Sequence, residues 1–273
     1  MNDYGIQMPD GVHVDESTDT LGRFVIQPLE RGYGITIGNA FRRVMLSSLQ
    51  GVAITALRID GVQHEFSTVP DVSEDVSDII LNLKGIRLKA ETTTMGNISL
   101  EMEGPGTWTG KDLAKASAEF EVLNPDHHIA TLDKGAKMLI ELRIGVGRGY
   151  VPAEENKRAD DPIGVIAIDS IFTPIKNVKY NVTQTRVGQK IDYEKLEIEV
   201  ATDGSVTPDE AITQAAMILR EHVSLFIKVD AEPEQVVQEQ EVDAEVQRMR
   251  TMFMQSVDEL DLSVRAHNCL KAA

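Results

Sequence analysis

A helical pattern in the last quarter of the chain most constrains how the sequence can fold. Thr207-Pro208-Asp209-Glu210 combines a threonine cap, a proline at the first helical position and a glutamate three residues after the cap. Apolar residues then recur at helical spacing: Ala211, Ile212, Ala215, Ala216, Ile218, Leu219, Val223, Leu225, Phe226 and Ile227. A helix with so broad an apolar surface must be covered on more than one side, and part of that cover could come from another polypeptide.

A second helical stripe lies near the other end of the sequence, from residue 37 to 49. Its apolar positions repeat at i, i+3, i+4, i+7 and i+8, as Ile37, Ala40, Phe41, Val44 and Met45. Arg42 and Arg43 flank the stripe. Gly32-Tyr33-Gly34 before it is interpreted as a flexible breaker, and Gly51 after it as a helix stop.

Between the two helical patterns the sequence is mostly strand. Residues 21–29 form the first candidate, and alternating patterns predict strands at 98–102, 119–122, 138–144, 165–168 and 196–200. Asp60-Gly61 separates two alternating runs, 54–59 and 62–66, which predicts a hairpin. Ser73 is expected to cap a short helix that ends before Gly85 and buries Val76, Ile79, Ile80 and Leu83.

Composition limits the partners open to this protein. Its 273 residues suit about two domains, and 27 basic against 44 acidic residues give a formal net charge of −17. A protein that mainly grips phosphates should carry a basic face, so direct DNA binding by the whole molecule is disfavoured. No apolar run reaches the roughly 18 residues of a membrane span, no secretion signal is recognisable, and Cys269 is alone, which indicates a reducing cytoplasm. The acidic segment 230–247 is interpreted as a linker or a weak helix.

Candidate catalytic motifs are weak. Gly145 to Gly149 follows a strand, but Pro152 does not open a helix, so a glycine-rich turn is favoured over a phosphate loop. His127 and His128 should point to opposite faces of a strand and are poorly placed to share a metal. The acids at 154, 155, 160 and 161 are interpreted as solvated loop residues. These observations favour an interaction protein over an enzyme, with no cofactor of its own.

Several sequence blocks, in order, resemble the alpha subunit of bacterial-type DNA-directed RNA polymerase. They are LERGYG (29–34), GNAFRRVMLSS (38–48), IDGV (59–62), HEFST (64–68), ILNLKG (80–85), GRGYVPA (147–153), VDEL (257–260) and RAHNCL (265–270). Together they span most of the sequence, from about residue 20 to 271, and are far more specific than any single motif above.

The resemblance implies an α+β fold with a two-subdomain amino-terminal assembly domain. Residues 1–17 would be a tail. Residues 18–50 and 178–228 would form a discontinuous helix and sheet dimerisation subdomain, and residues 51–177 an inserted, mostly β subdomain. Residues 229–256 would be an acidic linker, and 257–273 the start of a helical, DNA-binding carboxy-terminal domain that is cut short.

The resemblance also implies a function. The protein would be a non-catalytic subunit of a nucleotidyltransferase, pairing with a second copy through helices at about 36–49 and 208–227. The dimer would scaffold the beta and beta-prime subunits for transcription, with omega and sigma in the holoenzyme. The catalytic magnesium would sit on a partner subunit, and the protein would act in the cytoplasm, at the nucleoid.

Individual residues match family positions. Arg43 and Leu46 match positions that contact the beta subunit, and Lys84, Ile168 and Ile175 match positions implicated in the beta-prime contact. The expected dimer interface comprises Phe41, Val44, Ile218, Leu219 and Leu225. Arg265 and Asn268 match the DNA-reading helix, which would bind promoter DNA and regulators if that domain were complete.

Two other functions stay open at this point. An unrelated homodimeric binding module would form a stable dimer without recruiting large subunits. An acidic enzyme using the loop at 145–149 would bind a nucleotide and lose that affinity in Gly147→Val. Because the polymerase subunit and the binding module would both dimerise, dimerisation alone does not separate them.

Overall fold

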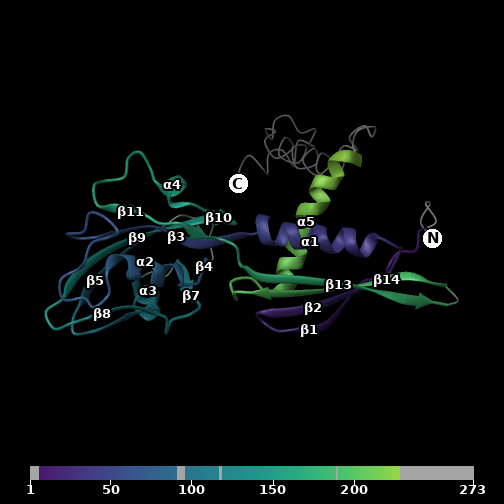
Figure 1. The fold of residues 1–273 in the computed structure, drawn as a ribbon, viewed down its shortest axis with the longest axis horizontal. Helices are drawn as coiled ribbons and strands as arrows, with labels where there is room; N and C mark the ends of the chain where they lie inside the picture. The colour runs from purple at the N-terminus through teal and green to yellow at the C-terminus, as the bar shows by residue number, and fades with distance from the viewer. Residues whose placement is uncertain (1–5, 91–95, 117–118, 189, 228–273) are drawn as a thin grey trace, which may run out of the picture. The chain divides into compact units, whose positions relative to one another are not determined.

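The computed structural model describes residues 6–90, 96–116, 119–188 and 190–227 (Figure 1). The protein divides into two compact units, 1–221 and 222–273. The first unit holds all the elements below except the end of the last helix. Its buried apolar side chains form two separate clusters, one under each of two sheets. The predicted α+β class is confirmed.

The first sheet joins segments from both ends of the unit. Within the described residues it has four antiparallel strands in the order β1 (Val12–Ser17), β2 (Leu21–Leu29), β14 (Lys190–Thr202) and β13 (Ile175–Val187). The strand predicted at 21–29 is therefore confirmed as β2. Residues 12–17, expected in an amino-terminal tail, instead form the edge strand β1, because they pair with β2.

Two helices belong with this sheet. Helix α1 (Tyr33–Ser48) runs along β13 and β14, and helix α5 (Pro208–Ile227) begins shortly after β14 ends (Figure 1). The capping box is confirmed: the Thr207 amide donates to the Glu210 carboxylate at 3.0 Å, and the Glu210 amide donates to the Thr207 hydroxyl at 3.3 Å. The core contains Phe24, Met45, Leu196, Ile198 and Ala215, all at most 2% exposed.

Helix α1 begins earlier than the sequence predicts, because its glycines pack rather than break. A Cβ at Gly34 would lie 2.8 Å from Cγ1 of Val182, and one at Gly38 would lie 2.7 Å from Cδ2 of Tyr180. Both glycines are buried and one helical turn apart, so they let the helix backbone approach the sheet closely. The interpretation of Gly32-Tyr33-Gly34 as a breaker is therefore wrong for Gly34.

The second sheet carries the rest of the unit. Its order is β5 (Gly96–Glu103), β9 (Lys137–Arg148), β3 (Gln50–Ile59), β4 (Leu88–Ala90) and β7 (Phe120–Val122), and β11 (Val165–Ala167) also pairs with β3. Two short pairs join β6 (Gly106–Thr109) to β8 (His128–Leu132) and β10 (Tyr150–Val151) to β12 (Ser170–Ile171). The helices here are α2 (Val76–Lys84), α3 (Gly110–Ala116) and α4 (Ala153–Asn156). The core of this part draws on buried residues from Ile54 to Ile168.

The predicted hairpin at Asp60-Gly61 is wrong in its second half. Gly61 does adopt a positive φ of 80°, and the Val62 amide closes a turn onto the Ile59 carbonyl at 3.1 Å. Residues 62–66 form no strand, however, because β9 already occupies one edge of β3 while β4 and β11 occupy the other. The turn therefore leads away from the sheet.

Two further local predictions change. Asp75, not Ser73, caps α2: its carboxylate accepts from the Asp78 amide at 2.8 Å, while the predicted apolar face of α2 is confirmed. Gly51 lies inside β3 rather than stopping α1. A Cβ at Gly51 would come within 1.7 Å of the Phe172 carbonyl oxygen, and one at Gly147 within 2.6 Å of the Phe172 ring, so the glycines of β9 and β3 make room for Phe172.

Candidate protein-interaction surfaces

The exposed side of α1 brings together the two residues expected to contact the beta subunit. Arg43 and Leu46 lie three positions apart and therefore on one face of the helix. Arg43 is exposed and Leu46 is 36% exposed. Among the described residues, Arg43 forms no ion pair, and the Ser47 hydroxyl donates to its backbone carbonyl at 2.8 Å. The guanidinium is thus available to a partner.

The start of α1 is held by a residue far along the sequence. Gly32 precedes the helix in a left-handed conformation, φ 90°, and supplies no side-chain cap. The Glu194 carboxylate of β14 accepts instead from the amides of Gly32 and Gly34, at 2.9 and 3.0 Å. A carboxylate here satisfies two free N–H groups and opposes the positive end of the helix dipole. This contact fixes the helix that carries Arg43, and no local sequence signal marks it.

The residues expected at the dimer interface differ in exposure. Phe41, Val44 and Ile218 are half-buried against the first core of their own subunit, and Leu219 is also half-buried. Leu225 is 67% exposed. Further exposed apolar side chains surround it on α5, namely Met217 at 50%, Val223 at 57%, Phe226 at 81% and Ile227 at 71%.

Lys84 ends α2 and lies in a pair that the sequence did not indicate. Its ammonium group forms an ion pair with the Asp169 carboxylate, and the Tyr150 hydroxyl donates to the same carboxylate at 3.2 Å. The hydrogen bond from Lys84 lowers the pKa of Asp169. The charge of Lys84 is therefore fixed in place beside a partner carboxylate.

A groove of about 320 Å³ adjoins this pair, and we call it the Lys84 groove; its lining includes Phe66, Ile80, Leu81, Lys84, Ile166 and Asp169. Phe66 is 81% exposed and Leu81 is 62% exposed. An ion pair at the edge of exposed aromatic and aliphatic side chains is a surface suited to a protein partner. The groove thus places two of the expected residues, Lys84 and Ile168, in one surface.

Ile168 and Ile175 offer little area to that surface: Ile168 is among the residues that line the groove but is almost fully buried, and Ile175 is not among them. Ile168 is 2% exposed in the second core, and Ile175 is 3% exposed in the first. Neither residue offers much area to a partner, so the expectation that they touch beta-prime directly is not supported by their burial. Ile168 does precede Asp169, and it can act by positioning that residue.

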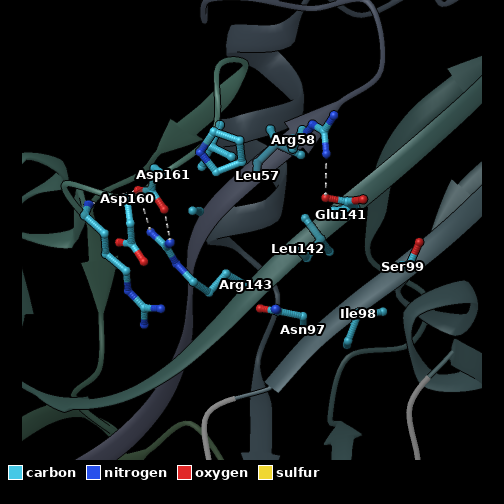
Figure 2. Close-up of a pocket in the computed structure, with 14 residues that line it drawn as sticks. Leu57, Arg58, Asn97, Ile98, Ser99, Glu141, Leu142, Arg143, Asp160 and Asp161 are labelled. Carbon is cyan, nitrogen blue, oxygen red and sulfur yellow. Dashed lines mark hydrogen bonds and ion pairs between the residues drawn. The ribbon is translucent and has the colours of Figure 1, made fainter.

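A second groove, of about 450 Å³, lies over β3, β9 and β5 (Figure 2). Figure 2 shows Arg143 reaching toward Asp161, with hydrogen bonds of 2.5 and 3.3 Å, while Arg58 pairs with Glu141 at 3.2 Å. Arg143 also donates to the Asn156 carbonyl at 2.8 Å. The hydrogen bond from Arg143 lowers the pKa of Asp161. Asp161 is therefore not the solvated acid expected: its side chain is 12% exposed, and it ties the loop to the sheet.

The other candidate motifs also have structural partners. The ring of His127 bonds the Asn82 carbonyl at 2.9 Å, and His128 bonds Glu74 at 2.7 Å, so the pair serves two separate contacts. Residues 145–148 belong to β9 and form no loop. Over the residues that the structure describes, no group of three or more His, Cys, Asp or Glu side chains could hold a metal ion, and no helix is long and apolar enough to cross a membrane. Arg265 and Asn268 lie outside the described residues.

The exposed apolar side chains of α5 and of the Lys84 groove, together with the exposed Arg43, are typical of a protein that binds other proteins. Comparison with known proteins identifies which kind. Residues 57–173 match the family model of the RNA polymerase Rpb3/RpoA insert domain, and residues 243–273 match that of the carboxy-terminal domain of the bacterial RNA polymerase alpha subunit. The second match begins at residue 243, before the expected start at 257.

Full-length relatives agree. The protein is 67% identical over 273 residues to the DNA-directed RNA polymerase subunit alpha of Salinibacter ruber, covering all of its own sequence and 83% of that relative. It is 53% identical to the same subunit of Prosthecochloris aestuarii, over 99% of its own sequence and 84% of the relative. The protein belongs to the family of bacterial DNA-directed RNA polymerase alpha subunits. The expected function, an assembly subunit of RNA polymerase, is thereby confirmed.

Proposed function

We propose that the protein forms a homodimer through α1 and α5, and that this dimer holds the beta and beta-prime subunits of the polymerase in register. The main support for this proposal is the exposed apolar end of α5. Val223, Leu225, Phe226 and Ile227 are 57–81% exposed within about one turn at the end of the helix. Contiguous exposed apolar side chains of this kind mark a protein interface rather than a free surface. The proposed dimer buries them together with Phe41, Val44, Ile218 and Leu219.

In this proposal the dimerisation subdomain comprises residues 18–50 and 178–228. The inserted subdomain comprises residues 51–177. Strand β1 joins the dimerisation subdomain because it pairs with β2, and the acidic linker precedes the carboxy-terminal domain region that begins at residue 243. The first core lies in the dimerisation subdomain apart from Ile175, and the second core lies in the insert.

The beta subunit binds the face of α1 that carries Arg43 and Leu46. An arginine beside an aliphatic residue can form charge-assisted hydrogen bonds while the apolar neighbour excludes water, which is typical of residues that dominate an interface. The cap from Glu194 supports this role because it holds the start of the helix in place.

The beta-prime subunit binds the Lys84 groove. Phe66 and Leu81 supply apolar area, and the pair of Lys84 with Asp169 supplies a fixed charge. Ile168 and Ile175 act as positioning residues from within the two cores. The catalytic magnesium lies on a partner subunit, so this protein contributes to nucleotidyl transfer only through assembly. The complete enzyme adds omega and sigma, and promoter DNA would be contacted through the carboxy-terminal domain.

The first test is reconstitution with the cognate beta subunit, comparing the wild-type protein, Arg43→Ala and Arg42→Ala by size exclusion. Arg42→Ala is a matched control because it removes the same kind of residue from the next position of the same helix. We expect Arg43→Ala to remain a free dimer while wild type and Arg42→Ala take up beta. A wild-type dimer that binds no large subunit would contradict the proposal and favour an unrelated dimeric binding module.

The beta-prime surface is tested in the same assay after beta has bound. Leu81→Asp places a charge in the Lys84 groove, whereas Leu139→Asp places it at a position on β9 that is 44% exposed and outside the groove. We expect only Leu81→Asp to block the addition of beta-prime. If both variants bind beta-prime equally well, the Lys84 groove is not the beta-prime contact.

A further inference from the structure

The edge strand β1 leaves an apolar face that the described part of its own subunit does not cover. All of its residues are exposed, including Val12 at 53% and Val14 at 51%. Val12 lies opposite Ile26 and Val14 opposite Phe24, and directly opposed residues point to the same side of a sheet. Phe24 is 2% exposed in the first core. We call these two valines the β1 face. They extend the side of the sheet that forms the first core.

The end of α5 presents a second exposed apolar surface, which we call the α5 arm and which comprises Val223, Phe226 and Ile227. Ala215 is fully buried, and no later residue of the described helix is. At 1.5 Å per residue, the helix continues for about 18 Å beyond Ala215. Val223, Phe226 and Ile227 fall at i, i+3 and i+4, so they form one apolar ridge. The arm therefore offers a ridge to whatever covers it.

We propose that the α5 arm of each copy packs on the β1 face of the other copy. The inference rests on the proposed dimer and adds to it a receiving surface outside the two helices. In a two-fold dimer the contact occurs twice, because the arm of the first copy on β1 of the second requires the reverse contact as well. Both exposed surfaces are then buried by the same event.

The dimensions of the two surfaces agree. Alternate residues of a strand are about 6.6 Å apart, so Val12 and Val14 present two side chains at that spacing. Val223 and Ile227 are one helical turn apart, a rise of about 6 Å. The ridge of the arm can therefore contact both valines at once. A second copy fits better than an unrelated partner, because every copy carries one arm and one β1 face in equal number.

The first test is the dimer dissociation constant, measured by sedimentation with the full-length protein. Val14→Asp places a charge on the β1 face, and His13→Asp places the same charge one residue away. His13 lies opposite Val25 and points to the other side of the sheet, which makes it a matched control. We expect Val14→Asp to weaken the dimer by about tenfold or more and His13→Asp to leave it unchanged.

The second test is site-specific cross-linking, which does not require a disruptive substitution. Cys269 is first replaced by serine, and one version of the protein then receives Val14→Cys while another receives Phe226→Cys. The two versions are co-expressed and treated with a short bis-maleimide. We expect a cross-linked dimer from the mixture and none from either version alone, and this product cannot form within one polypeptide.

The outcomes separate this inference from the dimer itself. If Phe226→Asp dissociates the dimer while Val14→Asp does not and no cross-link forms, the inference is wrong and the helix-mediated dimer stands. If Val14→Asp dissociates the dimer but no cross-link forms, another segment covers β1 and the inference is again wrong. If Phe226→Asp leaves the dimer unchanged, both the inference and the proposed role of α5 fail.

Discussion

Single residues in this protein hold distant segments together through charge. Arg143 on β9 pairs with Asp161 in the loop before β11, and their side chains are 13% and 12% exposed. Asn156, the last residue of α4 just before this loop, donates to the Ile168 carbonyl at 2.7 Å and to the Ser170 hydroxyl at 3.0 Å. The loop is therefore fixed to the sheet by several polar contacts, and the pair of Arg143 with Asp161 is the most buried ion pair among the described residues.

We expect Asp161→Asn to lower the free energy of unfolding by about 3 kcal/mol near neutral pH, because Arg143 keeps its charge and loses its partner. The pKa of Asp161 is lowered by the hydrogen bond from Arg143. The stabilisation is therefore fully present above the ordinary carboxylate pKa of about 4, and it is lost as the pH falls through the lowered pKa. Urea unfolding at neutral pH and at about pH 3 should show the difference from wild type shrinking in acid. Asp160→Asn, an exposed neighbour, should match wild type at both.

At the scale of elements, sequence patterns predicted the secondary structure correctly where neighbouring residues determine it. The alternation at 21–29 and the capping box at 207–210 depend on neighbouring residues, and both predictions are confirmed. The hairpin failed because the partners of β3 are decided by strands far along the sequence. Gly34 was misread for the same reason: its role depends on Val182.

The candidate surfaces likewise combine features that the sequence predicts with features that depend on residues distant in the sequence. Arg43, Leu46 and Lys84 came from the resemblance to a family, which supplies residue positions but not their surroundings. Asp169 meets Lys84, and Tyr150 meets Asp169, only through the fold, so neither could be found from spacing. The burial of Ile168 and Ile175 was likewise invisible in the sequence, because the segments around them show no pattern that separates a core residue from a contact residue.

The packing of α1 on its sheet gives a prediction at this scale. A methyl group at Gly38 would lie 2.7 Å from Cδ2 of Tyr180 and 3.0 Å from Cδ1 of Leu196. We expect Gly38→Ala to destabilise the fold by about 1–3 kcal/mol in urea unfolding, although alanine favours a helix by about 1 kcal/mol. Gly106→Ala, where no atom lies within 4 Å of the new methyl group, should change little. A stable Gly38→Ala would show that helix and sheet can separate freely.

At the scale of the whole molecule, charge and apolar contact oppose each other. Each copy carries a formal net charge of −17, so two copies repel at long range. The surfaces proposed to join them are apolar. Added salt screens the repulsion and does not weaken apolar contact. Raising the salt concentration is therefore expected to strengthen the dimer.

We expect the dimer to tighten as sodium chloride is raised from low concentration to several hundred millimolar, by up to about tenfold in dissociation constant. Sedimentation across a salt series measures this directly. A dimer that falls apart at high salt would instead indicate an interface built on ion pairs between copies. That result would contradict the apolar interface proposed for α1 and α5.

The pairing of β2 with β14 has a consequence for how this protein is made. Gly32, at the start of α1, and Glu194, which caps it, are 162 positions apart. A ribosome adding about 5–20 residues per second needs roughly 8–32 s to cover that interval. For that time β2 and α1 have emerged without β13 and β14, although β1 is available to pair with β2. The second core, which uses only residues 54–168, can already close. Synthesis therefore folds the middle before the ends, and a pause in translation between β12 and β14 would prolong the exposure of the very helix that carries Arg43.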